Sequence, residues 1–119
     1  MKKNFVPNKV IIDIDGVMTS GHMIYSSKGK IGKIFGPDDN DALKLLNKYC
    51  SIEFISSDKV GFTISKKRID DMNFKITHVP TSKKENWFNK NKYQKKTIYM
   101  GDGIFDHNIF KIVGFSITF

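Results

Sequence analysis

The chain has one cysteine, one arginine and no long apolar run among its 119 residues. The single cysteine, Cys50, excludes an internal disulfide framework, and we expect it to be a buried structural residue. No stretch approaches the roughly 20 apolar residues needed to cross a bilayer, and the basic N-terminus precedes a segment too polar for a signal peptide. These absences predict a cytoplasmic protein without membrane contact.

The near absence of arginine bears on nucleic-acid binding, which the net charge of +8 would otherwise favour. Arg68 is the only arginine among 20 basic residues, although arginine makes the bidentate contacts to bases and phosphates. The lysines are scattered in pairs and are not interleaved with aromatic residues as on a base-stacking surface. We therefore expect a solvated lysine-rich surface that steers anionic substrates, with no nucleic-acid partner.

Apolar strands alternate with amphipathic helices along a chain of one-domain length, residues 1–119. We expect core strands at residues 10–14, 52–55, 74–79, 97–100 and 115–118. Helices are expected to end near residues 49, 72, 91 and 112. Short strands at residues 23–25 and 33–35, around a flexible tip at 26–32, predict a hairpin flap over about residues 20–36. The fold class is therefore α/β: a doubly wound, Rossmann-like parallel sheet of about five strands, with helices on both faces and the hairpin after the first strand.

The first strand ends in the most informative motif, Asp13-x-Asp15-Gly16-x-x-Thr19. Ligands bind outside the carboxyl ends of parallel strands, and two charges buried there are costly unless a bound metal ion keeps both ionised. The motif resembles motif I of the haloacid-dehalogenase-like (HAD) phosphohydrolases, which needs four residue types at fixed spacing after a strand.

Two later strand ends offer groups that could hold a phosphoryl group. Ser56, followed by Ser57, matches the short Ser/Thr motif II of the family, although any strand can end in a turn serine. The family also places a lysine at the start of the helix after the third core strand, where a fixed cation offsets phosphoryl charge. We choose Lys83 for this role, and Lys84 remains the alternative because the chain has 19 lysines.

The fourth core strand leads into Gly101-Asp102-Gly103, with Asp106 four residues after the first aspartate, and resembles motif IV. Asp102 would project toward the motif I carboxylates, and three carboxylates with water suit Mg²⁺. Asp106 could ligate the metal as well, or hydrogen-bond Lys83. Gly103 departs from the most familiar form of the motif, which has aspartate there.

The short gap before the first helix resembles the capless HAD branch that contains the 3-deoxy-D-manno-octulosonate 8-phosphate phosphatases and the phosphatase domains attached to acylneuraminate cytidylyltransferases. The segments at residues 21–25 and 35–40 carry this resemblance. It implies a homo-oligomer, a tetramer, in which a neighbour's hairpin helps close each active site. Asp38 and Asp58 stand where the branch usually has basic residues, and the branch's C-terminal segment is absent from this sequence.

The resemblance implies Mg²⁺-dependent hydrolysis of a small phosphorylated metabolite, a sugar or sugar-acid phosphate, through an aspartyl-phosphate. Asp13 is then the nucleophile and Asp15 the acid and later the base. Lys83 neutralises charge in the transition state. The implied phosphate-binding residues are Gly16, Thr19, Ser56, Ser57 and Lys83. The implied metal ligands are Asp13, Asp15 through its main-chain carbonyl, and Asp102.

Two rival functions were weighed against this one. A receiver domain has its phosphoacceptor at the end of the third strand, but that strand ends here in Thr77-His78-Val79-Pro80 without an aspartate. A catalytically weak or inactive HAD-like binding domain that needs a partner subunit is favoured by Gly103 and the missing C-terminal segment. The retention of clustered carboxylates argues against it.

Overall fold

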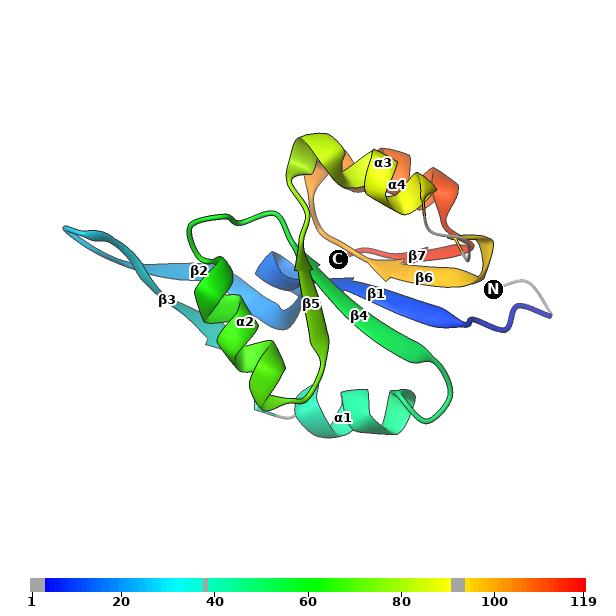
Figure 1. Ribbon diagram of the computed structural model, residues 1–119, viewed down its shortest axis with the longest axis horizontal. Coiled ribbons are helices and arrows are strands. Elements are labelled where there is room, and N and C mark those ends of the chain that lie inside the picture. The colour runs from blue at the N-terminus through cyan, green and yellow to red at the C-terminus, as the bar shows by residue number, and fades with distance from the viewer. Residues whose placement is uncertain (1–3, 38, 91–93) are drawn as a thin grey trace.

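The computed structural model describes residues 4–37, 39–90 and 94–119, and its centre is a five-stranded parallel sheet (Figure 1). The strands are β1 (Lys9–Asp13), β4 (Ser51–Ser56), β5 (Lys75–His78), β6 (Thr97–Met100) and β7 (Phe115–Ile117). Their order is β5-β4-β1-β6-β7, with every neighbouring pair parallel. The predicted α/β class and the five core strands are confirmed.

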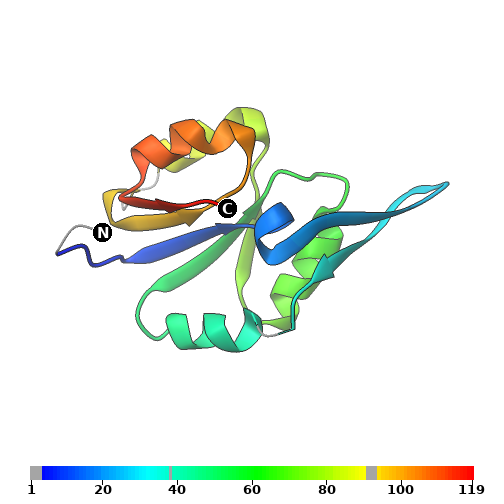
Figure 2. The ribbon, with the colours of Figure 1, turned by 180° about the vertical axis from the view of Figure 1, so that it is seen from behind.

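Two helices cover each face of the sheet (Figures 1 and 2). The helices are α1 (Asp39–Leu46), α2 (Phe62–Asp71), α3 (Lys84–Asn89) and α4 (His107–Ile112). Leu43 of α1 and Ile69 of α2 pack in one core cluster, while Phe88 of α3 and Ile109 of α4 pack in the other. The order of strands requires this division, because right-handed crossovers put helices on opposite faces when the chain reverses direction across the sheet.

Three short 3₁₀ turns connect these elements, at Thr81–Lys83, Gln94–Lys96 and Ile104–Asp106. Cys50 is buried, as predicted, and is a free thiol. No helix in the described part of the chain is long and apolar enough to cross a bilayer.

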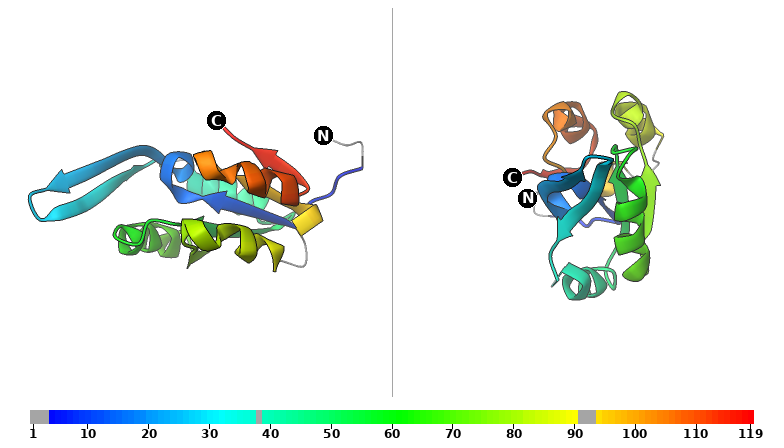
Figure 3. Two further views of the ribbon diagram at one scale, coloured as in Figure 1. Left: turned by 90° about the horizontal axis from the view of Figure 1, so that it is seen from above. Right: turned by 90° about the vertical axis from the view of Figure 1, so that its left-hand side faces the viewer.

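A separate antiparallel hairpin, β2 (Thr19–Ser26) and β3 (Gly29–Phe35), projects from the body of the protein (Figure 3). Its presence after β1 was predicted, but its strands are longer than expected, and only Ser27 and Lys28 separate them. The extent predicted for the tip, residues 26–32, is therefore wrong. The reason is that β2 is exposed along almost all of its length, so no alternation of buried residues marked its extent.

The register of the sheet brings the predicted motifs together. Asp13, the last residue of β1, lies beside Ile55 of β4, and Ile12 lies beside Met100 of β6. The residues that follow β4 and β6 therefore flank Asp13 at the carboxyl edge of the sheet, where open α/β sheets bind ligands.

Candidate active site

Asp13 is a buried carboxylate at the end of the central strand, with 9% of its surface exposed. One of its oxygens accepts a hydrogen bond from the backbone N–H of Ile14 at 2.9 Å, and the other lies 3.4 Å from the Lys84 ammonium. Desolvation by burial raises the pKa of Asp13 to about 6, against the attraction of Lys84. The site therefore makes a charge on Asp13 costly unless cations share the pocket.

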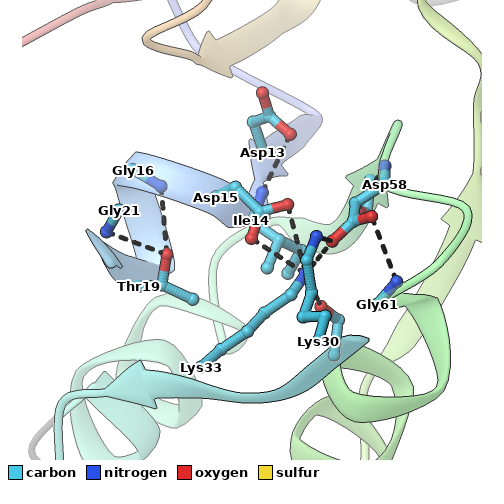
Figure 4. A network of polar contacts seen from close by, with 12 residues as sticks. Asp13, Ile14, Asp15, Gly16, Thr19, Gly21, Lys30, Lys33, Asp58 and Gly61 are labelled. Carbon is cyan, nitrogen blue, oxygen red and sulfur yellow. Dashed lines mark hydrogen bonds and ion pairs between the residues drawn. The ribbon is translucent and has the colours of Figure 1, made fainter. Parts of the chain in front are cut away.

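The turn after β1, Ile14–Met18, is shaped by a glycine and a threonine (Figure 4). Gly16 has a φ of +83°, which glycine adopts without strain. The Thr19 hydroxyl accepts hydrogen bonds from the backbone N–H groups of Gly16 (3.1 Å) and Gly21 (3.2 Å). Thr19 is buried, and its hydroxyl accepts two hydrogen bonds from the turn. Its side chain therefore supports the turn and does not form part of the pocket wall.

Lys84, the first residue of α3, is the lysine that reaches the carboxylates. Its Nζ lies 2.7 Å from Asp106 Oδ1 and 5.5 Å from the centre of the Tyr99 ring. Lys83, our first choice, is exposed in the preceding 3₁₀ turn. Because consecutive helical residues point about 100° apart, a start displaced by one residue changes which lysine faces the sheet. The structure thus places the alternative, Lys84, in the site.

Asp106 is almost fully buried, with 1% of its surface exposed. Its oxygens accept hydrogen bonds from Lys84 and from the backbone N–H of Gly103, the latter at 3.0 Å. The structure therefore pairs Asp106 with the lysine at this position, one of the two roles that the sequence left open.

The two serines after β4 differ in their surroundings. Ser56 is fully buried, and its hydroxyl accepts a hydrogen bond from the backbone N–H of Asp58 at 3.2 Å. Ser57 lines the pocket and donates to the carbonyl of Val79 at 2.7 Å. Of the two serines, Ser57 is therefore the one that lines the pocket.

A buried network of charges joins the hairpin to the site, and sequence reasoning missed it (Figure 4). Lys33 of β3 lies 2.8 Å from Asp15 Oδ1 and 3.0 Å from Asp58 Oδ2. Lys30 lies 2.5 Å from the same Asp58 oxygen, and Gly61 N–H donates to the other at 3.0 Å. Burial alone would raise the pKa of Asp58, but these hydrogen bonds hold it well below its usual range. Among so many lysines, no sequence pattern distinguished these two.

These side chains surround a pocket of about 210 Å³ at the carboxyl edge of the sheet. Its lining residues are Asp13, Asp15, Ser57, Asp58, Thr81, Lys84, Asp102, Gly103, Phe105 and Asp106. A neighbouring hollow of about 450 Å³ shares Thr81, Lys84 and Phe105 with it. A water molecule occupies about 30 Å³ in the liquid, so the smaller pocket has room for a phosphoryl group. Asp38, a departure noted in the sequence, lies outside the described residues.

Only some of the carboxylates in this pocket are available to bind a divalent cation. Within residues 4–37, 39–90 and 94–119, no three Asp, Glu, His or Cys side chains converge as a metal-binding group. The Asp15 carboxylate is turned to Lys33, whereas Asp102 makes no hydrogen bond or ion pair with another described residue. A hard cation would therefore be held by the carboxylates of Asp13 and Asp102 and by main-chain oxygen, a donor set that suits Mg²⁺.

No protein-family model and no curated protein matches this sequence. Solved structures do match. The cobalt-bound deoxy-D-mannose-octulosonate 8-phosphate phosphatase of Haemophilus influenzae is 26% identical, with a TM-score of 0.77 over 95% of this chain and 68% of that one. The 3-deoxy-D-manno-octulosonate 8-phosphate phosphatase of Moraxella catarrhalis, in complex with magnesium, phosphate and KDO, is 21% identical, with a TM-score of 0.80 over 96% and 68%. The Yersinia pestis enzyme of that name is 19% identical, with a TM-score of 0.75 over 96% and 64%. The fold and the resemblance to HAD phosphatases predicted from the motifs are confirmed.

Proposed function

We propose that this protein is a metal-dependent phosphate-monoester hydrolase that acts on a small phosphorylated metabolite, a sugar or sugar-acid phosphate. The main support is the buried Asp13 at the end of the central strand, which shares one pocket with Asp15, Lys84 and Asp102. The structural neighbours, which are HAD-family phosphatases, support the same reaction class. A catalytically inactive binding domain is not favoured, because such a domain has no need of carboxylates assembled around a buried lysine.

The reaction proceeds in two steps on this chain's own residues. An oxygen of Asp13 attacks phosphorus, the bond to the leaving oxygen breaks, and Asp15 gives that oxygen a proton. Asp15 then takes a proton from water as the water attacks the aspartyl-phosphate, which releases phosphate and restores Asp13. Lys84 offsets the negative charge that gathers on the phosphoryl oxygens, and the Ser57 hydroxyl could donate to one of them only by turning away from the Val79 carbonyl.

Asp13, Asp102 and the main-chain carbonyl of Asp15 would hold Mg²⁺. The bound ion supplies the positive charge that lets an anionic carboxylate approach an anionic phosphate. Asp106 is not assigned to the metal, since Lys84 and Gly103 already occupy its oxygens.

The lysines near the pocket bear on which substrates it can bind, because those already paired with carboxylates are not available to a substrate. Lys30 and Lys33 are committed to Asp58 and Asp15, so they offset charges within the protein. Lys84 is paired with Asp106 but also faces the pocket. Lys84 is therefore the cation available to the phosphoryl group in this pocket.

The hairpin supports assembly into a homo-oligomer, which we propose is a tetramer. Its exposed side chains include large apolar ones: Met23, Ile24, Tyr25, Ile31 and Ile34. Several large apolar side chains exposed on one projecting element are a reason to expect a protein–protein contact there.

The proposed reaction is tested by phosphate release from a panel of sugar phosphates, sugar-acid phosphates and p-nitrophenyl phosphate, with Mg²⁺ and with EDTA. We expect release that requires the metal and ranks the sugar phosphates above the aryl ester in kcat/KM. Failure of a well-folded protein to release phosphate from any ester would refute the proposal.

A further inference from the structure

Lys33 is a fully buried lysine that the proposed reaction does not use. Its side chain has 0% of its surface exposed. It contacts Asp15 in the turn after β1, Asp58 in the loop after β4, and the hydroxyl of Ser65 on α2 at 2.8 Å. The contacts with Asp15 Oδ2 and Ser65 are hydrogen bonds, and that with Asp58 is an ion pair, so the ammonium group is held from three sides.

The contacts of Lys33 bear on Asp15 in a way that those of Lys30 do not. Lys33 is the only cation that pairs with the Asp15 carboxylate among the described residues, at 2.8 Å from Oδ1 and 3.2 Å from Oδ2. Lys30 is also nearly buried, but its ion pair is with Asp58 alone. If Lys33 were removed, Asp58 would still be paired with Lys30. Asp15 would then have no paired cation among the described residues.

We propose that Lys33 is a positioning residue, which fixes the Asp15 carboxylate where it can pass a proton to the leaving oxygen. This role rests on the proposed phosphatase function and deepens it. Asp15 sits in a turn with non-helical backbone, at φ −72° and ψ 121°, so helix hydrogen bonds do not fix its direction there. A residue from the hairpin, 18 positions further along the chain, does so instead.

The consequence of this role depends on the leaving group. A general acid is effective only within hydrogen-bond reach of the oxygen that it protonates. A sugar alkoxide is a poor leaving group and needs that proton, whereas p-nitrophenolate departs without one. Loss of Lys33 should therefore slow sugar-phosphate hydrolysis more than p-nitrophenyl phosphate hydrolysis, a difference that mere loosening of the hairpin would not produce.

The test compares Lys33→Met, Lys33→Arg and the matched control Lys30→Met on both kinds of ester. We expect Lys33→Met to lower kcat on the sugar phosphate at least tenfold more than on p-nitrophenyl phosphate, with KM changed less than kcat. Lys33→Arg should recover part of the loss, because it keeps the charge. Lys30→Met should leave the ratio of the two kcat values unchanged. Equal losses on both esters, or the same change of ratio in Lys30→Met, would overturn the role.

A second measurement does not depend on activity, and it applies if Lys33→Met folds poorly. Thermal unfolding in EDTA of Asp15→Asn, Lys33→Gln and the double variant should give non-additive changes in Tm, because both single changes break the same ion pair, while Asp15→Asn combined with Lys67→Met, which breaks only an exposed pair with Asp71, should be additive. Additive changes for the first pair would overturn the contact on which the role depends. A wild-type protein that releases no phosphate while the first pair stays non-additive would instead refute the proposed function.

Discussion

Single residues at the edge of the sheet set the electrostatics of the site. Asp13 and Asp106 are both buried, and one ammonium group, that of Lys84, lies between them at 3.4 and 2.7 Å. Two buried carboxylates with one cation leave a net negative charge, which a divalent metal ion would offset. A bound metal ion would therefore act together with Lys84 to keep Asp13 ionised.

Lys84 and Lys83 provide a matched pair for testing the proposed cation. Lys84→Met should lower kcat by about 10²–10³, the usual effect of removing one group that stabilises transition-state charge. It should also lower Tm, since breaking a buried ion pair from one side typically costs about 3–5 kcal/mol. Lys83→Met, at an exposed position, should change neither kcat nor Tm appreciably. Phosphate release and thermal unfolding measure both; a larger loss of kcat in Lys83→Met would contradict the assignment.

The raised pKa of Asp13 predicts a pH-dependent stability. Its folded-state pKa is about 6 instead of 3.8, so its contribution to stability is full below the lower value and is lost as pH rises through the upper one. Asp13→Asn imitates the protonated carboxyl. It should therefore stabilise the metal-free protein at about pH 7, by up to about 3 kcal/mol, and have little effect at about pH 4.

Urea unfolding of wild type and Asp13→Asn in EDTA at the two pH values checks this prediction. A difference in unfolding free energy that does not grow with pH would contradict it. A bound Mg²⁺ would lower the pKa of Asp13, so the metal-loaded enzyme should keep its kcat/KM to a lower pH than this metal-free value indicates, and lose it where Asp13 becomes protonated, because a protonated carboxyl is not a nucleophile.

At this scale the sequence indicated which carboxylates lie together better than which lysines lie beside them. Asp13, Asp15 and Asp102 were chosen from their spacing after strands, and they line one pocket in the structure. The choice between Lys83 and Lys84 required the start of a helix to within one residue, which capping patterns do not give. Lys33 could not be found at all, because its partners lie 18 to 32 positions away in the chain.

Among the elements, the turn between β1 and β2 does most to hold the site together. It carries Asp15, it is closed by the Thr19 hydroxyl, and its glycine lies against the Asp102 carboxylate. The turn is therefore the contact between motif I and motif IV, and small changes in its backbone should reach the carboxylates directly.

A comparison of Gly16→Ala with Gly21→Ala distinguishes a loss of stability caused by backbone strain from a loss of activity. Both glycines have a φ of +83°, so each alanine should cost about 1–2 kcal/mol of stability. A Cβ at Gly16 would also overlap the Asp102 carboxylate, whereas at Gly21 the nearest heavy atom is 3.9 Å away. Tm should fall in both variants, and metal-dependent phosphate release should be lost only in Gly16→Ala. Full release by Gly16→Ala would show that Asp102 is not needed where the structure places it.

The bounds of the strands and helices could be predicted where buried apolar residues define them. Core strands such as β1 and β6 are continuous apolar runs, and their positions agree with the sequence to within a residue. The hairpin strands were predicted too short because Thr19 is the only one of their residues that is fully buried. The first helix also ends three residues earlier than expected, at Leu46.

At the scale of the whole molecule, the hairpin projects into solvent with several large apolar side chains exposed. The extents of 50 × 32 × 23 Å reflect its projection from the body of the protein (Figure 3). Lys30, close to the two-residue tip, and Lys33, further along β3, pair with carboxylates at the candidate site of the same chain, while large apolar side chains of the hairpin are exposed. A neighbouring copy that covered these side chains would bury apolar surface, and it would lie close to the lysines as well, because Met23 and Tyr25 are the cross-strand partners of Lys33 and Lys30.

The proposed tetramer predicts that charge on the exposed hairpin surface will dissociate it. Tyr25 and Ile31 are 66% and 60% exposed, so the variant with Tyr25→Lys and Ile31→Lys should fold normally. Light scattering should give a tetramer mass for wild type and a smaller mass for the variant. A wild-type monomer, or a variant with unchanged mass, would contradict the use of the hairpin in assembly.

The central claim is that Asp13 attacks phosphorus. It is tested most directly by phosphate release from the best ester with Mg²⁺, in wild type and in Asp13→Asn of equal foldedness by circular dichroism. The account predicts steady release by wild type and none by the variant, since an amide cannot form the aspartyl-phosphate. Hydrolysis by Asp13→Asn at the wild-type rate would contradict it.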